Sequence, residues 1–220
     1  MNPPKSKPLG KYFLFLLTLL ILLILVPVFD DDQWGAPTTG VVTMLTMIFG
    51  LNSVAQERRT LSIAIGLGII AYGLTTWAWI SGGTYILALP FQLAFFLFIN
   101  LSILRTVLET KDINADVVCG GIAVYLLLGV NWTIVFMTIE FISPGSIVVL
   151  NSMDKSPLES PMDFLYFTFV TLTTLGYGDI APVSNAARSA SIGAAVSGTL
   201  YIAVFIGRLV GLTTTQVHRD

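Results

Sequence analysis

The sequence predicts an all-α membrane protein in which six transmembrane helices are combined with one re-entrant half-helix and the loop that follows it. Of the 220 residues, 55% are hydrophobic and 11% are charged, against roughly 25% charged residues in soluble globular domains. The mean hydropathy is +0.83. A surface with so few charges must face lipid over most of its area. The apolar residues also gather in runs near the length of about 20 residues that a membrane-crossing helix needs.

The composition excludes several classes of function. A net charge of −2 gives no sign of nucleic-acid binding. With one cysteine, Cys119, the chain forms no internal disulfide or thiolate metal cluster, and the one histidine, His218, lies near the C-terminal end. No set of nucleophile, base and metal ligands converges, so we expect neither an enzyme nor a bound cofactor.

Six apolar runs account for the six predicted spans. The first is too long for the apolar region of a signal peptide, about 7–15 residues, and no small-residue cleavage site follows it. Short polar breaks separate the first five runs, and a longer segment of mixed character, 142–183, precedes the last. The predicted spans are 12–29, 38–55, 61–80, 85–108, 117–141 and 184–213.

The basic residues predict how the spans are oriented. If the N-terminus is cytoplasmic, nine of the 11 lysines and arginines lie at cytoplasmic ends, and only Lys155 and Arg188 lie outside. This excess is typical of cytoplasmic loops. We therefore expect a multi-pass protein of the cell membrane with both termini in the cytoplasm and the 142–183 segment facing outward.

The 142–183 segment contains a short helix with a clear start signal. Ser160 can act as the N-cap, Pro161 is tolerated at the first helical position, and Asp163 completes a capping box. The predicted helix covers 161–174, and its apolar run of about 11 residues corresponds to about 16 Å, half a membrane. Such a half-helix must return through non-helical backbone, which is tolerated at membrane depth only beside protein or a water-filled cavity.

The residues at 174–178, Thr-Leu-Gly-Tyr-Gly, suit that return. Gly176 and Gly178 permit backbone angles that other residues resist, so that successive carbonyl groups can point to one side. Four such segments around an axis would stack rings of oxygen atoms that replace the hydration shell of a cation. The C-terminal end of the half-helix favours a cation near the membrane centre, and Asp179 adds negative charge at the outer mouth.

The run Thr173–Asp179 resembles the Thr-x-Gly-Tyr-Gly-Asp signature of potassium channels. Leu175 replaces the commoner valine or isoleucine, a mild departure if the backbone carbonyl is the ligand. The apolar runs predict a four-helix transmembrane domain at 1–112, and the resemblance, which covers about 115–213, implies a pore domain at 113–220. Within the latter, it implies an outer helix, a pore helix, a selectivity filter and an inner helix at 117–141, 161–174, 174–179 and 184–213.

The resemblance also implies roles for individual residues around the filter. The Thr174 hydroxyl closes the inner end, and the Tyr177 ring packs against the pore helices. Tyr166 matches a position at which family members often carry a tryptophan that hydrogen-bonds Asp179, so Tyr166 and Thr173 are expected to support the filter. The K+ sites are expected at Thr174, Leu175, Gly176 and Tyr177, with Gly178 completing the filter.

The last helix is expected to line an inner cavity. Glycine in membrane helices often marks close packing, but the resemblance places a bending point at Gly198, which is a candidate gating hinge. Thr199 and Ile202 would then face the cavity. Ile206 and Val210, four residues apart on one helix face, are candidates for an apolar constriction that gates by dewetting.

The first four helices lack the charges of a voltage sensor. The fourth predicted span contains only Arg105, and one elementary charge supplies only about 2.3 kcal/mol per 100 mV. The sequence therefore predicts a homotetrameric, potassium-selective channel subunit in contact with K+ and lipid, without steep voltage gating. A weakly selective cation channel and a non-conducting structural or signalling subunit are the alternatives.

Overall fold

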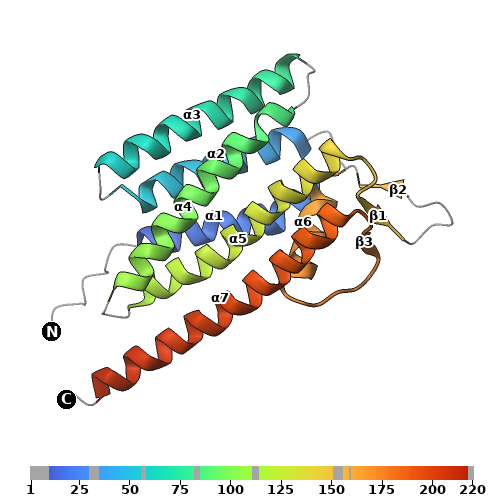
Figure 1. The fold of residues 1–220 in the computed structure, drawn as a ribbon. Helices are drawn as coiled ribbons and strands as arrows, with labels where there is room; N and C mark the ends of the chain where they lie inside the picture. The colour runs from blue at the N-terminus through green and yellow to red at the C-terminus, as the bar shows by residue number, and fades with distance from the viewer. Residues whose placement is uncertain are drawn as a thin grey trace.

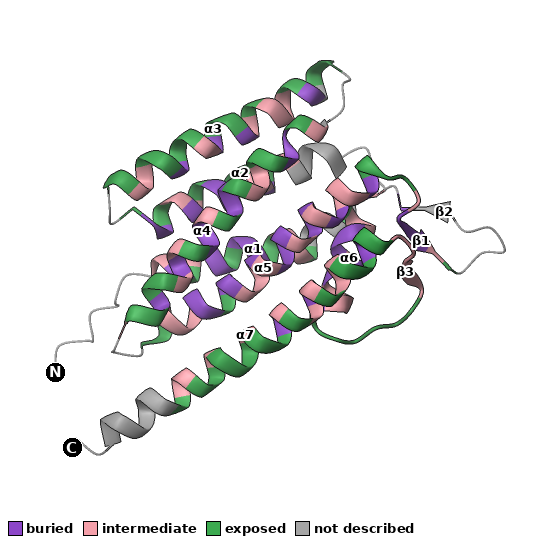
Figure 2. Cartoon of the chain, viewed as in Figure 1, coloured by how far each residue is buried: buried purple, intermediate pink, exposed green. Residues whose placement is uncertain are grey.

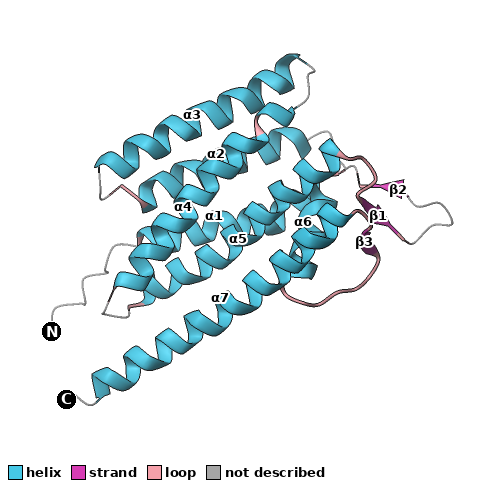
Figure 3. Ribbon diagram, viewed as in Figure 1, coloured by secondary structure: helices cyan, strands magenta, loops and turns pink. Residues whose placement is uncertain are grey.

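The computed structural model describes residues 10–29, 35–55, 58–81, 85–110, 114–150, 156–158 and 160–217. In these ranges the chain forms seven α-helices, one short 3-10 helix, η1, and a small sheet of three strands (Figure 3). The helices are α1 (Lys11–Phe29), α2 (Gly35–Ser53), α3 (Arg58–Ser81), η1 (Tyr85–Leu87), α4 (Leu89–Glu109), α5 (Ala115–Ile142), α6 (Pro161–Leu172) and α7 (Asn185–Val217). The strands are β1 (Ile147–Val149), β2 (Ser156–Pro157) and β3 (Ile180–Pro182).

The long helices run roughly along one direction, and α6 lies with the sheet towards one end of the molecule (Figure 1). Among the described residues, four helices are long and apolar enough to cross a membrane: Arg58–Ala78, Leu89–Glu109, Ala115–Ile142 and Asn185–Val210. Two shorter apolar stretches, Lys11–Ile24 and Gly40–Ser53, lie in α1 and α2. The chain is therefore a membrane protein with several spans, and the six expected spans stay a prediction.

One hydrophobic core joins the first five helices. It is built around fully buried side chains such as Phe15, Phe95, Ile99 and Leu127, and Tyr201 and Phe205 of α7 pack against it. Only residues 110–114 connect α4 to α5, so these two helices are sequence neighbours that pack directly on each other. Residues on both sides of the predicted domain boundary at 112/113 thus share one core.

Three contacts tie these helices together. The Asn100 amide donates a hydrogen bond of 3.2 Å to the carbonyl of Val124, which links α4 to α5. The carboxylate of Asp116 at the start of α5 accepts hydrogen bonds from the main-chain amides of Tyr12 and Phe13, both at 3.1 Å. It thereby satisfies amides at the start of α1 that have no partner within their own helix.

The boundaries of several helices differ from those expected, and two of the differences have a clear physical reason. The predicted fourth span begins at 85, whereas the chain forms η1 first and α4 begins at Leu89. The physical reason is Pro90, which lacks an amide hydrogen and fits in the first turn of a helix but not further along it. Similarly, α6 ends at Leu172 rather than at 174, because Thr174 has a positive φ of 59° and cannot continue a right-handed helix.

The small sheet was not expected in an all-α protein. Its strand order is β2-β1-β3, and both pairings are antiparallel. A second buried cluster packs beneath it, formed by Phe136, Ile147, Leu158, Phe164, Phe167, Ala187 and Ala194. The sheet therefore caps the end of the bundle at which α6 lies.

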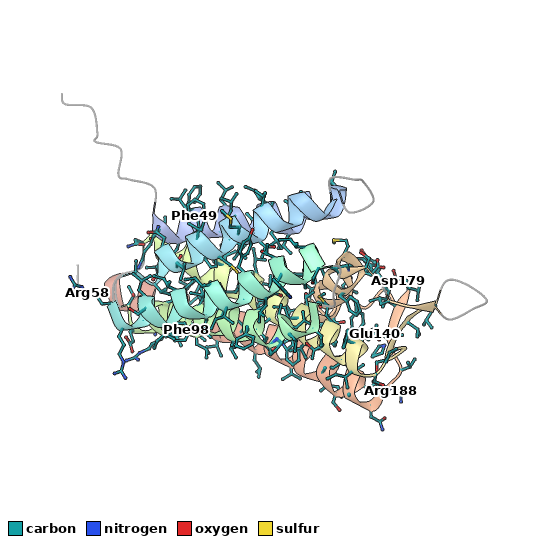
Figure 4. All side chains as sticks on the ribbon, turned by 90° about the horizontal axis from the view of Figure 1, so that it is seen from above. Phe49, Arg58, Phe98, Glu140, Asp179 and Arg188 are labelled. Carbon is teal, nitrogen blue, oxygen red and sulfur yellow. The ribbon has the colours of Figure 1, made fainter. Side chains whose placement is uncertain are left out.

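The charged residues that bear on orientation separate as expected. Arg58 lies at the opposite end of the molecule from Asp179 and Arg188 (Figure 4). The start of α1 and the end of α7 lie at one common end (Figure 1). Five other basic residues used for the orientation lie outside the described residues, namely Lys5, Lys7, Lys111, Lys155 and Arg219. Which end faces the cytoplasm stays a prediction.

Candidate functional site

The half-length helix α6 begins at the predicted signal. The Ser160 hydroxyl accepts a hydrogen bond of 3.1 Å from the amide of Met162, and Pro161 occupies the first helical position. At its other end, the amide of Thr173 donates a 3.0 Å hydrogen bond to the carbonyl of Phe169. The helix contains 12 residues, or about 18 Å at the usual rise per residue. It is therefore too short to cross a bilayer.

The backbone of the 174–178 segment alternates in handedness. Thr174, Gly176 and Gly178 have positive φ angles of 59°, 62° and 81°, whereas the residues between them do not. Positive φ costs glycine little but is uncommon for other residues, and Thr174 is the sole described non-glycine residue that adopts it. Such an alternation allows successive carbonyl groups to face one side of the chain, as the sequence had suggested for the two glycines.

Hydrogen bonds to the end of α6 fix the start of this segment. The amides of Leu175 and Gly176 both donate to the carbonyl of Val170, at 2.9 and 3.3 Å, and the amide of Thr174 donates to the carbonyl of Thr171 at 3.0 Å. The Thr173 hydroxyl donates to the carbonyl of Phe169 at 2.6 Å. The start of the segment is therefore hydrogen-bonded to the last turn of α6.

Side chains of this segment remain exposed in the single chain. Leu175 is 56% exposed and Tyr177 is 66% exposed. Much of α7 is similar, and Figure 2 shows exposed residues along most of this helix. Its exposed apolar residues include Val196, Leu200, Ile202, Val204, Ile206 and Val210. Apolar side chains exposed at such density require either lipid or another protein surface to cover them.

The Tyr166 hydroxyl donates a hydrogen bond of 2.8 Å to the carboxylate of Asp179, which is the contact that the sequence analysis expected. The Tyr166 ring also lies parallel to the Tyr177 ring, with 6.3 Å between centroids and 8° between planes. The bond to the carboxylate raises the pKa of the Tyr166 phenol to about 12. The phenol is therefore protonated, and able to donate this bond, throughout the physiological pH range.

The outer end of the segment has a second support that the sequence analysis missed. The amide of Leu150 donates a 2.7 Å hydrogen bond to the carbonyl of Asp179, next to the pairing of β1 with β3. At the end of α5, the buried carboxylate of Glu140 accepts hydrogen bonds from the amides of Gly145 and Ile147. A glutamate followed closely by Ser-Pro-Gly at 143–145 was the available signal.

Gly198 lies against the C-terminal end of α6, at Leu172. A Cβ atom at this position would lie 2.4 Å from the carbonyl oxygen of Leu172. One residue earlier, the Ser197 hydroxyl accepts a 3.0 Å hydrogen bond from the Trp132 indole of α5. The helix α7 is continuous through this point. Gly198 therefore has a packing role in this conformation, and its role as a hinge stays a prediction.

The predicted cavity and gate residues lie along α7. Thr199 is exposed, and its hydroxyl donates to the carbonyl of Ala195 within the helix. Ile202, Ile206 and Val210 are 41%, 53% and 60% exposed. The structure thus leaves these three apolar side chains uncovered by the rest of the chain.

Another side of α7 is fixed to α4 and α5. The Tyr201 hydroxyl donates a 2.6 Å hydrogen bond to the carbonyl of Gly121, and Phe205 lies directly over the same glycine. One turn further on, Arg208 donates a 2.9 Å hydrogen bond to the carbonyl of Thr110 at the end of α4. Tyr201, Phe205 and Arg208 share one helix face, which holds the C-terminal half of α7 against the rest of the chain.

The arrangement offers main-chain oxygen atoms to a cation. Among the described residues, no three His, Cys, Asp or Glu side chains gather closely enough to hold a metal ion. The carbonyl groups of 174–177, by contrast, lie in a segment whose alternating backbone can align them. Carbonyl groups aligned in this way can replace the water around a monovalent cation.

Comparison with known proteins agrees with this geometry. Residues 117–215, a little under half of the chain, match a family described as an ion channel. The voltage-gated potassium channel Kch of Escherichia coli strain K12 is 29% identical over 175 residues, which cover 76% of this chain and 37% of that protein. The two pore potassium channel b of Oryza sativa subsp. japonica is 32% identical over 84 residues, which cover 38% of this chain and 20% of that protein. The chain thus spans much less than half the length of either relative.

Proposed function

We propose that this chain is one subunit of a homotetrameric potassium channel that conducts K+ passively, with its selectivity filter at 174–178. The observation that carries the proposal is the alternating backbone of this segment at the end of a half-length helix. The matches to ion channels and to two potassium channels support the same function. The permeant ion is the only small-molecule partner that we propose, and the function needs no cofactor and no nucleic acid.

Fourfold assembly follows from the chemistry of a dehydrated ion. One chain supplies carbonyl groups from one side only, whereas a K+ ion that leaves water needs oxygen ligands all around it. Four copies around an axis close such rings by the symmetry that homo-oligomers favour. The exposed side chains of Leu175 and Tyr177, together with the exposed apolar residues of α7, provide surfaces that the neighbouring copies would cover.

The proposed roles of individual residues follow this geometry. The carbonyl groups of 174–177 bind K+, and the hydroxyl of Thr174 closes the inner end of the filter. Asp179 supplies negative charge at the outer mouth and is held there by Tyr166. Thr199 and Ile202 line the cavity, Ile206 and Val210 form the apolar constriction, and α7 bends at Gly198. Residues 113–220 then form the pore domain and 1–112 form a peripheral four-helix domain.

Voltage is not the main gating stimulus in this proposal. Arg105 is the one basic residue of α4. Its side chain is 80% exposed and forms a 2.8 Å ion pair with Glu109 four residues on. This single charge supplies only about 2.3 kcal/mol per 100 mV even if it crosses the whole field. The relative from Escherichia coli is named as voltage-gated, and we do not extend that property to this chain.

The reversal potential under opposed K+ and Na+ gradients tests the proposal. Purified protein is placed in planar lipid bilayers with Gly178→Ala as the variant, because alanine cannot easily adopt the positive φ of 81°. We expect wild-type currents to reverse near the K+ equilibrium potential and the variant to lose this selectivity or the current. A matched variant, Gly207→Ala, lies in α7 with open space around the glycine and should leave selectivity unchanged.

The same measurement separates the alternatives. A weakly selective cation channel would reverse between the two equilibrium potentials in the wild type. A non-conducting structural or signalling subunit would give tetramers without current, in a multi-pass protein of the cell membrane whose termini we place in the cytoplasm. Chemical labelling of single introduced cysteines from either side of sealed vesicles tests that orientation.

A further inference from the structure

Asp179 is held from two directions, and only one of them involves its side chain. The carboxylate accepts the hydrogen bond of 2.8 Å from the Tyr166 hydroxyl. The main-chain carbonyl of the same residue accepts the hydrogen bond of 2.7 Å from the amide of Leu150. The second contact comes from a loop some thirty positions earlier in the chain and acts on the backbone itself.

The contact at Leu150 continues a strand pairing. In the antiparallel ladder of β1 and β3, Val149 lies opposite Ile180 and Ile147 lies opposite Pro182. The amide of Val183 donates a further 2.8 Å hydrogen bond to the carbonyl of Ser146. Every residue that leaves the filter, from 179 to 183, is therefore aligned along β1.

The strand β1 is in turn anchored to the helices. Both carboxylate oxygens of Glu140 accept amide hydrogens, from Gly145 and from Ile147, the latter at 2.9 Å. Glu140 is 7% exposed and Ile147 is fully buried in the cluster with Phe136 and Phe164. Glu140 and Asp179 lie at the same end of the molecule (Figure 4). Because Glu140 belongs to α5, β1 cannot shift without disturbing the end of that helix.

We propose that the outer sheet is a positioning element for the filter, in which the Leu150 amide fixes the carbonyl of Asp179 and Glu140 fixes β1. This inference rests on the proposed function. Gly178, the residue before Asp179, has a φ of 81° and little conformational restraint of its own. The orientation of the carbonyl groups at 177 and 178 therefore depends on what holds the backbone just beyond them.

Two substitutions at one residue isolate the backbone contact. Leu150→Pro removes the amide hydrogen, and the extended conformation of Val149 in β1 is the one favoured before a proline. Leu150→Ala is the matched control, because it shortens the same side chain, which is 42% exposed, but keeps the amide. Both variants are reconstituted as full-length tetramers, and current is followed as external potassium is lowered.

We expect the potassium concentration that sustains half of the current to rise about fivefold in Leu150→Pro, which corresponds to about 1 kcal/mol, the usual net value of one hydrogen bond. Leu150→Ala should match the wild type. Equal potassium dependence of assembled Leu150→Pro and Leu150→Ala would overturn the proposal. If Leu150→Pro does not assemble, Glu140→Gln takes its place, since the amide side chain retains only one acceptor oxygen. A wild-type response of Glu140→Gln would then count against the inference.

Amide hydrogen exchange over 174–183 separates failure of this inference from failure of the proposed function. If the wild type carries no potassium-selective current, the proposed function fails. Faster exchange in Leu150→Pro than in Leu150→Ala would still show that β1 orders this segment. Equal exchange in the two variants would overturn the positioning role as well.

Discussion

Replacement of Gly198 by alanine places a methyl group where the structure has no room for one. The new Cβ would lie 2.4 Å from the carbonyl oxygen of Leu172 and 2.9 Å from its Cδ1 atom. Contacts of a Cβ atom essentially never fall below 3.0 Å. Helix α7 and the C-terminal end of α6 must therefore separate by at least 0.6 Å, the difference between this limit and the 2.4 Å distance to the oxygen. The obstacle is backbone, so a side-chain rotation cannot remove it.

The expected magnitude combines two opposing effects. Overpacking of a filled site usually costs about 1–3 kcal/mol. Against this, alanine is favoured over glycine within a helix by about 1 kcal/mol. We therefore expect Gly198→Ala to lower the free energy of unfolding by up to about 2 kcal/mol, and by about 1–3 kcal/mol relative to Gly207→Ala, which shares the gain from alanine. Gly207→Ala, which has no neighbouring atom within 4 Å of the new methyl group, should leave it unchanged or raise it by up to about 1 kcal/mol.

Denaturant unfolding in detergent measures both variants, and bilayer recordings show which part of the channel is affected. Because Leu172 lies two residues before the proposed filter, the displacement should reach that segment. We expect it to reduce potassium selectivity or the current itself, whatever the open probability. A pure hinge at Gly198 would instead change open probability and leave stability and selectivity intact. Equal stability of Gly198→Ala and Gly207→Ala would refute the packing argument.

Three further predictions concern contacts elsewhere in the chain. Tyr166→Phe should remove one tyrosine from the ultraviolet pH titration, the one with a pKa of about 12. In the wild type, the hydrogen bond to Asp179 should persist below the ordinary tyrosine pKa and be lost as the pH rises through about 12. Gly121→Ala, whose Cβ would lie 2.0 Å from the Phe205 ring, should lower the free energy of unfolding by about 1–3 kcal/mol. In a double-mutant cycle, Phe205→Leu should recover part of this loss. Asp116→Ala should cost about 1 kcal/mol in the same assay, since two amides at the start of α1 lose their acceptor, whereas Asp116→Asn should cost less.

The helices could be predicted from local signals, and the outer sheet could not. Ser160 and Pro161 mark the start of α6, and the structure confirms the cap. The strands of the sheet contain three residues or fewer, so no alternation of apolar and polar side chains can develop. One of the two partners of β1, β3, lies beyond α6, and such non-local pairing leaves no local trace in the sequence.

The candidate site was likewise predictable only in part from the sequence. The glycines at 176 and 178 allowed positive φ angles to be predicted there, but Thr174 adopts one too, against its own preference. Its amide is bonded to the carbonyl of Thr171, so the fold at the end of α6 overrides that preference. The contact between Tyr166 and Asp179 was expected from a resemblance and not from residue spacing. Glu140 went unnoticed as a support because its partners are main-chain amides, and the Ser-Pro-Gly turn that follows it at 143–145 was the one local signal.

The short connection between α4 and α5 bears on how the protein is made. Since only residues 110–114 link them, α1 to α5 of one chain can pack on each other as soon as α5 has left the ribosome. A newly made chain therefore needs no helix from a neighbour to complete this core. It can remain in the bilayer as a folded monomer. In the proposed tetramer, assembly would then be the lateral meeting of finished subunits through α6 and α7. Two different versions of the chain produced in one cell should accordingly mix at random.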